Sequence, residues 1–166
     1  MNIIHRRAKL DDLKEIVSLL ADDKLGRTRE QASSEVAQSY LDAFAKIDSD
    51  PNQYLMVLEN DGEVIGTCHL TLMPSLTFSG STRLQIEAVR VDRRIRGQNP
   101  CRSEAPQERR GIGQQMIEFA INWGFDHGAT IIQLTTNKER PDALRFYKKL
   151  GFKASHEGMK LYLGQR

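Results

Sequence analysis

The residues Asn60-Asp61-Gly62 lie between two apolar segments, and this arrangement is one of the strongest local constraints in the sequence. Asp-Gly between apolar segments favours a tight hairpin turn, because such turns need residues that tolerate positive φ angles. We therefore expect antiparallel strands at 54–58 and 63–72. A loop at 74–80 and a long strand at 83–91 extend this unit into a meander.

Helical and extended patterns alternate around the meander. Apolar residues recur at helical spacing after Asp11 or Asp12, which can cap a helix. The full set of further expected elements is a strand at 3–8, helices at 11–20, 30–45, 111–127 and 141–150, and strands at 130–135, 152–154 and 159–163. This order predicts a single α/β domain over residues 1–166. Its sheet should be mixed, mostly antiparallel, with six or seven strands and helices on both faces.

The composition is that of an ordinary globular protein. The 166 residues are 39 % hydrophobic and 28 % charged, with a formal net charge of +2. These values exclude a disordered or fibrous chain, and so small a charge does not by itself imply a nucleic-acid or membrane partner. Cys68 and Cys101 form no metal or redox spacing, and no signal peptide or spanning segment is visible. We expect a reduced cytoplasmic protein.

The charge is concentrated in one segment. Residues 93–110 contain six arginines and two acids, so this stretch is locally about +4. Three interpretations stay open: a solvated loop, attraction of an anionic ligand, and nucleic-acid binding. The last is disfavoured because residues 92–110 offer no aromatic side chain on which a base could stack.

The same segment holds the most informative glycines. Arg96-Gly97-Gln98 follows the strand at 83–91, and Gly111-Ile112-Gly113-Gln114 begins the next helix. Free backbone N–H groups and the helix dipole make such a start a good phosphate site, and glycine lets the phosphate approach. A dinucleotide fingerprint would need glycine where Met116 stands, and the Gly-Lys-Ser/Thr of a P-loop is absent. A plain helix start with permissive glycines is the alternative.

Short motifs along nearly the whole chain resemble the GNAT superfamily of N-acetyltransferases. In order, these motifs are Val89-Arg90-Val91, Arg96-Gly97-Gln98, Gly111-Ile112-Gly113, Asn137, Phe146-Tyr147 and Leu150-Gly151-Phe152. The resemblance implies acetyl-CoA as co-substrate and direct attack of an amine on its thioester. It also implies that the fourth and fifth strands, near Val91 and Thr130, are parallel neighbours that splay apart to admit the coenzyme.

The family's pyrophosphate motif, Arg/Gln-x-x-Gly-x-Gly/Ala, is interrupted in this chain. Arg96-Gly97-Gln98 resembles its first half and Gly111-Ile112-Gly113 its second, which makes residues 99–110 an insertion. An uninterrupted alignment would place Glu108 at the arginine position, where a carboxylate would repel phosphate, so we favour the split motif. Lengthening a loop from about 5 to about 17 residues costs only on the order of 1 kcal/mol. We expect the insertion to lie in solvent or to be disordered.

The resemblance also suggests catalytic residues. A lysine-like amine has a pKa near ~10.4, so its neutral form at pH 7 costs about 4.6 kcal/mol, and a general base is useful. Glu87 is the candidate base; by strand alternation it shares a face with Val89 and Val91. Tyr147 is the candidate acid for the departing thiolate. Their alternatives are a paired surface carboxylate and a packed aromatic ring.

The resemblance implies that the backbone of Val89, Arg90 and Val91 and the residue Asn137 contact the pantetheine arm of the coenzyme. Alternatively, Asn137 is only a turn residue before the helix that starts at Pro141. The four histidines are scattered, so we expect no metal site. The acceptor amine cannot be derived, although loops at 22–29 and 74–80 should shape its pocket. A non-catalytic coenzyme-A-binding module and, less favoured, a nucleic-acid-binding domain are the rival functions. Dimers are frequent among relatives.

Overall fold

The computed structural model describes residues 2–22, 25–30, 32–33, 35–97 and 111–163. The chain divides into two compact units, Met1–Gln133 and Leu134–Arg166. The first unit contains nearly all of the sheet, and the second contains the helix α5 (Pro141–Lys149). The organisation of residues 1–166 as a single domain stays a prediction.

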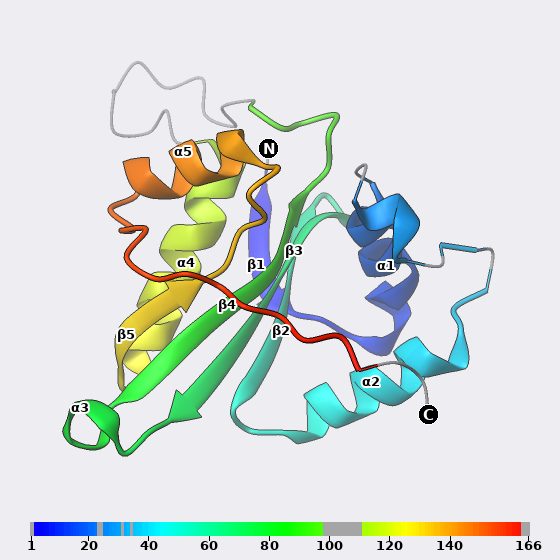
Figure 1. The fold of residues 1–166 in the computed structure, drawn as a ribbon. Coiled ribbons are helices and arrows are strands. Elements are labelled where there is room, and N and C mark those ends of the chain that lie inside the picture. The colour runs from blue at the N-terminus through cyan, green and yellow to red at the C-terminus, as the bar shows by residue number, and fades with distance from the viewer. Residues whose placement is uncertain (1, 23–24, 31, 34, 98–110, 164–166) are drawn as a thin grey trace. The chain divides into compact units, whose positions relative to one another are not determined.

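One sheet runs through the first unit (Figure 1). Its strands lie in chain order and pair antiparallel from β1 to β4. The fifth strand neighbours β4, as predicted for the strands near Val91 and Thr130, and is reached through the crossover helix α4. The strands are β1 (Ile3–Arg7), β2 (Gln53–Asn60), β3 (Glu63–Pro74), β4 (Thr82–Val91) and β5 (Ala129–Leu134).

The prediction of six or seven strands is wrong for the described residues, which form five. Neither 152–154 nor 159–163 is a strand. Met159 and Leu161 are 94 % and 87 % exposed, so their apolar side chains do not enter a core here. Alternation along a segment shows that it could be a strand, but it cannot supply the partner strand whose backbone groups complete a ladder.

The hairpin prediction at Asn60-Asp61-Gly62 is confirmed. Asp61 and Gly62 have φ angles of 51° and 86°, and both positive values fit a hairpin turn that follows the twist of the strands. The strands that the turn joins hold several of the fully buried side chains of the described residues. Met56, Val57 and Leu58 on β2 are all fully buried, as are Cys68 and Leu70 on β3. Each buried aliphatic side chain contributes roughly 1.5–3 kcal/mol by leaving water.

Helix α4 (Ile112–Asp126) covers one face of the sheet, as Figure 1 shows. Its buried residues fall on one side of the helix: Ile112, Met116, Ile117, Ala120 and Gly124. The helix lies very close to the strands. A Cβ on Gly124 would stand 2.7 Å from Cδ2 of Leu84, and one on Gly66 would stand 3.0 Å from Cε of Met116.

The opposite face is covered by α1 (Leu13–Ala21) and α2 (Gln38–Ser49). The one-turn helix η1 (Leu10–Asp12) precedes α1, and η2 (Gly26–Thr28) follows it. The core of this face is formed by Ala8, Leu13, Ile16, Phe44, Leu55 and Val57. Among the described residues, no helix is long and apolar enough to cross a membrane.

The predicted helix at 30–45 begins eight residues too early, because α2 starts at Gln38 and continues to Ser49. Ala37, its N-cap residue, is extended. Before it, the hydroxyl of Ser33 donates to the carbonyl of Glu35, a local bond that competes with helix formation. Val36 and Tyr40 both pack against the core of this face, but Val36 lies before the helix begins.

Candidate functional site

The start of α4 has the properties of an anion site. Gly111 is its N-cap, with φ −63° and ψ 151°, and its carbonyl accepts from the N–H groups of Gln114 and Gln115. The N–H groups that precede them have no intrahelical acceptor. A Cβ built on Gly111 meets no atom of the described residues within 4 Å, so those residues leave room for a ligand beside these donors. The helix dipole adds positive potential at this point.

The residues of the predicted motif that follow Gly111 differ in their surroundings. Ile112 is 1 % exposed and packs in the core, so only its backbone can face a ligand. The side-chain amide of Gln114 donates to Glu118 one turn along at 2.9 Å. Gly113 is partly buried in the first turn. Any anion binding at this helix start is therefore a property of the backbone rather than of these side chains.

The first half of the motif lies in the turn after β4. Arg96 donates through Nε and Nη2 to the carbonyl oxygen of Val91, at 3.1 and 2.8 Å, so its guanidinium caps the end of the strand. Gly97 has φ +81°, a left-handed conformation that favours glycine. Gln98 and the predicted insertion 99–110 lie outside the described residues.

A β-bulge interrupts β4 at Ala88. Thr67 pairs with Arg90 but His69 pairs with Glu87, so β4 carries one extra residue, and Ala88 has φ +52°. A positive φ on a residue with a Cβ is uncommon, and bulges and strained residues cluster at functional sites. The sequence alone gave no sign of this bulge, because alanine there fits a regular strand.

The bulge overturns the predicted alternation of β4. Val91 pairs with Gly66, and Ile86 with Leu70, so Val91 lies on the same face as Ile86. Both are buried, on the side that α4 covers. Glu87 therefore does not share a face with Val91, and Val89 lies within the bulge itself. The alternation rule failed because one extra residue moves every later side chain to the other face.

Glu87 and His69 are directly opposite each other across β3 and β4, on the face of α1 and α2. Glu87 is exposed, whereas Nε2 of His69 is buried without a hydrogen-bond partner in the described structure. Burial lowers the pKa of His69, and the charge of Glu87 partly opposes that shift. A largely neutral imidazole beside a carboxylate can hold or accept a proton at neutral pH.

His69 is not among the predicted site residues, because the four histidines are far apart along the chain. Their cross-strand positions were the better signal. Pro74 pairs with Thr82 across the predicted loop, and His69 and Glu87 both lie nine residues from Phe78 at its centre. Counting outward from the loop would have placed these two side chains together.

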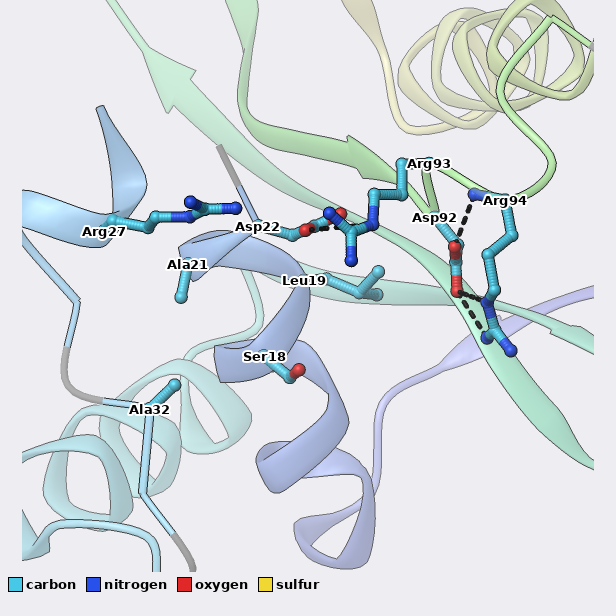
Figure 2. Close-up of a pocket in the computed structure, with 9 residues that line it drawn as sticks. All are labelled: Ser18, Leu19, Ala21, Asp22, Arg27, Ala32, Asp92, Arg93 and Arg94. Carbon is cyan, nitrogen blue, oxygen red and sulfur yellow. Dashed lines mark hydrogen bonds and ion pairs between the residues drawn. The ribbon is translucent and has the colours of Figure 1, made fainter. Parts of the chain in front are cut away.

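A cavity of about 340 Å³ lies beside the end of α1 (Figure 2). Its walls come from α1, from the loop that follows α1 and from the turn that follows β4. The lining residues are Ser18, Leu19, Ala21, Asp22, Arg27, Ala32, Asp92, Arg93 and Arg94. The predicted acceptor loop at 22–29 contributes to this cavity, whereas residues 74–80 do not line it.

The charged residues of the cavity are paired unequally. Arg94 contacts Asp92 and Glu63 at 2.5 Å, and its hydrogen bonds are the main reason that the pKa of Asp92 is lowered. Arg93 contacts Asp22 at 3.6 Å, which is beyond hydrogen-bond distance. Arg27 forms no ion pair with a carboxylate of the described residues. The cavity therefore has one tightly paired arginine, Arg94, and one with a looser contact, Arg93.

The remaining predicted site residues lie in the unit Leu134–Arg166. The side chain of Asn137 accepts from the N–H of Glu139, and its carbonyl accepts from that of Arg140, so Asn137 forms the turn before α5. The ring of Tyr147 lies edge-on to Phe146 and Phe152, with centroids 5.2 and 5.9 Å away. The roles of Asn137 and Tyr147 stay predictions.

Metal and thiol chemistry find little support in the residues described. No three His, Cys, Asp or Glu side chains in the described part of the chain gather as metal ligands. Cys68 is fully buried, and burial raises the pKa of its thiol to about 12, so it is not a nucleophile near neutral pH. Cys101 lies outside the described residues.

Comparison with known proteins identifies the family. The model of the acetyltransferase (GNAT) family matches residues 13–99 and 105–152. The chain belongs to the GNAT acetyltransferase family, as the motifs predicted. The match is interrupted at residues 100–104, inside the predicted insertion 99–110 but shorter than it.

Individual relatives agree with this assignment. The chain is 31 % identical to aminoalkylphosphonate N-acetyltransferase of Salmonella typhimurium over 119 residues, 72 % of this chain and 69 % of that protein. A solved structure described as a transcriptional regulator from Bacillus halodurans is 43 % identical, with a TM-score of 0.88, covering 98 % of this chain and all of that one. A predicted acetyltransferase with acetyl-CoA from Clostridium acetobutylicum shares the fold at 18 % identity and a TM-score of 0.69, covering 97 % and 96 %.

Proposed function

We propose that this protein transfers the acetyl group of acetyl-CoA to a primary amine. The start of α4 is the observation that carries the proposal. Its free N–H donors, the room that the described residues leave beside Gly111 and the helix dipole suit the diphosphate of coenzyme A. Gly111, Ile112, Gly113 and the turn around Arg96 and Gly97 would hold it, and the bound coenzyme supplies an acetyl thioester.

The amine must lose a proton before or during its attack, which costs about 4.6 kcal/mol at pH 7 for a lysine-like group. Glu87 is the proposed base, directly or through water. Its exposure leaves it accessible, and it stands beside the bulge at Ala88 and opposite His69. Tyr147 is proposed, from the resemblance, to protonate the departing thiolate.

The acceptor is proposed to be a small amine that carries an anionic group. The relative from Salmonella typhimurium is named for acetylation of aminoalkylphosphonates, and the arginine-lined cavity beside α1 is compatible with such a compound. An aminoalkylphosphonate is therefore the first acceptor to test, ahead of neutral amines and of peptides with a free N-terminus.

Release of free thiol from acetyl-CoA in the presence of a panel of amines tests the proposal. We expect release that depends on one class of amine. Glu87→Gln should lower kcat at least tenfold below pH 8 and less at higher pH, where more amine is neutral. Tyr147→Phe should lower kcat with little change in the affinity for acetyl-CoA. A chain that neither binds acetyl-CoA nor releases thiol with any amine would contradict the proposal.

A regulatory role is the second candidate, because the relative of 43 % identity is described as a transcriptional regulator. The arginines of residues 93–110 would then contact nucleic acid. An electrophoretic mobility shift of duplex DNA by the protein, with an affinity that falls steeply between 50 and 200 mM salt, would support this role. Thiol release without any DNA shift would favour the enzyme.

A further inference from the structure

One side of the cavity beside α1 is formed by a turn that packs closely against that helix. Gly26 lies so close to the end of α1 that a Cβ there would stand 2.1 Å from the carbonyl oxygen of Leu20, so only glycine fits. The next residue is Arg27, which the turn η2 directs to the cavity. The position of this arginine is therefore fixed by backbone packing, although its side chain is exposed.

The opposite wall comes from the turn after β4. Asp92 is tied to the sheet, since its N–H donates to the carbonyl of Ile65 at 2.9 Å. Its carboxylate binds Arg94, which leaves Arg93 to extend toward α1. Figure 2 shows the guanidinium groups of Arg27 and Arg93 both pointing toward Asp22 from opposite sides. Of these two guanidinium groups, that of Arg93 contacts the carboxylate of Asp22, and the contact is a loose one of 3.6 Å.

We propose that Arg27 and Arg93 bind the phosphonate or phosphate group of the acceptor amine. Resting on the proposed acetyl transfer, this inference adds the residues that select the acceptor. A guanidinium presents parallel N–H donors that match two oxygens of a tetrahedral oxyanion, and two such groups face one cavity here. The cavity volume of about 340 Å³ suits a small molecule.

Asp22 gives this site its selectivity. Its carboxylate points toward Arg93, 3.6 Å away, and repels a bare anion that approaches it. A compound that carries an ammonium group near its oxyanion is repelled less as it approaches, because its positive end offsets the charge of Asp22 until the amine is deprotonated for the attack. The site therefore favours a zwitterionic amine over inorganic phosphate. Its location on the side of α1 leaves the start of α4, on the other face of the sheet, to the coenzyme.

Kinetics with matched acceptors test the inference. The probes are 2-aminoethylphosphonate, its carboxylate analogue β-alanine, and propylamine, which lacks the anionic group. We expect kcat/KM to be at least tenfold higher for the phosphonate than for propylamine, with β-alanine between them. Arg27→Gln and Arg93→Gln should each reduce the phosphonate preference about tenfold, mainly through KM. Arg29→Gln, two residues from Arg27 and outside the cavity lining, should keep the preference.

Two results separate this inference from the proposed function. If the chain acetylates propylamine and 2-aminoethylphosphonate equally well, the proposed acetyl transfer is supported, and the proposed role of Arg27 and Arg93 is contradicted. If no amine is acetylated, calorimetric titration with 2-aminoethylphosphonate still reports on the site. Binding that is lost in Arg27→Gln but kept in Arg29→Gln supports it, and absence of binding to the native chain overturns it.

Discussion

The two faces of the sheet in the first unit are built differently. The face under α4 is mainly apolar and closely packed, with Leu84 against Gly124, Met116 against Gly66 and the imidazole of His5 stacked on Phe119. The face under α1 and α2 also has an apolar core, but it carries His69 and Glu87, an ion-pair network and the arginine-lined cavity. Tight packing on one side can hold the strands and the start of α4 in place. The other side is then free to vary its polar groups, which is where acceptor selectivity is proposed.

The comparison predicts that the largest loss of stability on the polar face comes from Asp12→Ala. Asp12 binds the guanidinium of Arg6 through two hydrogen bonds, of 2.7 and 2.9 Å, and accepts from the N–H of Lys9. Its side chain is only 10 % exposed. Removing it leaves Arg6 with Glu59 and the carbonyl of Arg7 as its partners among the described residues, so we expect a loss of about 2–4 kcal/mol in the free energy of unfolding.

Denaturant titration checks this value, with Asp11→Ala as the exposed control. Hydrogen bonding to Arg6 is the main reason that the pKa of Asp12 is lowered from 3.8. The network's contribution is therefore present above about pH 4 and lost as the pH falls further. A loss below about 0.5 kcal/mol would mean that the network acts as an ordinary surface ion pair.

A smaller effect is expected from Gly124→Ala on the apolar face. The added methyl group would stand 2.7 Å from Cδ2 of Leu84, which is fully buried. Overpacking should outweigh the better helix propensity of alanine and destabilise the protein by about 1–2 kcal/mol. Gly158→Ala, where a Cβ meets nothing within 4 Å, is the control.

A second change makes the test sharper. Leu84→Val removes volume next to the new methyl group, so the double variant with Gly124→Ala should be more stable than the two separate losses predict. If the stability losses of the two single variants add up to that of the double variant in thermal melts, α4 does not pack tightly against Leu84. The packing of the two faces would then not differ in this way.

The smallest expected effect is a pH dependence carried by one histidine on each face. His5 stacks on Phe119 of α4 at 4.8 Å, and His69 lies on the other face. Burial lowers the pKa of both from 6.5, so the unfolded chain binds protons more readily. Their contribution to stability is thus complete above about pH 6.5 and is lost as the pH falls below it.

Melting temperatures between pH 8 and pH 5 should show this loss. His5→Gln and His69→Gln should each flatten part of the profile, and His156→Gln, on an exposed residue, should leave it unchanged. If the melting temperature falls equally with pH in the native chain and in the double histidine variant, neither histidine causes the pH dependence.

Local signals in the sequence predicted most of the first unit. Asp61 and Gly62 specify their turn by their own conformational preferences, and the stripe from Ile112 to Gly124 specifies the buried side of α4. The failures involve information that lies elsewhere in the chain. Residues 159–163 alternate correctly but have no partner strand, and the bulge at Ala88 depends on the pairing with β3.

The candidate site shows the same division. Gly111 could be predicted, because a glycine at a helix start has a local physical meaning. The pair of His69 with Glu87, and the meeting of Arg27 with Arg93, depend on register and on the packing of α1. His69 and Glu87 could be found only by counting outward from the loop that joins their strands, and no spacing in the sequence shows that Arg27 and Arg93 line one cavity.

Calorimetric titration of acetyl-CoA into the native chain and into Gly111→Asp tests the central claim most directly. Aspartate is a good N-cap residue and has open space among the described residues at this position, so the variant should melt at the same temperature or higher. Its carboxylate would occupy and repel the proposed diphosphate position, and we expect the affinity to fall at least tenfold, while Gly111→Ser keeps most of it. Unchanged acetyl-CoA affinity in a folded Gly111→Asp variant would contradict the account.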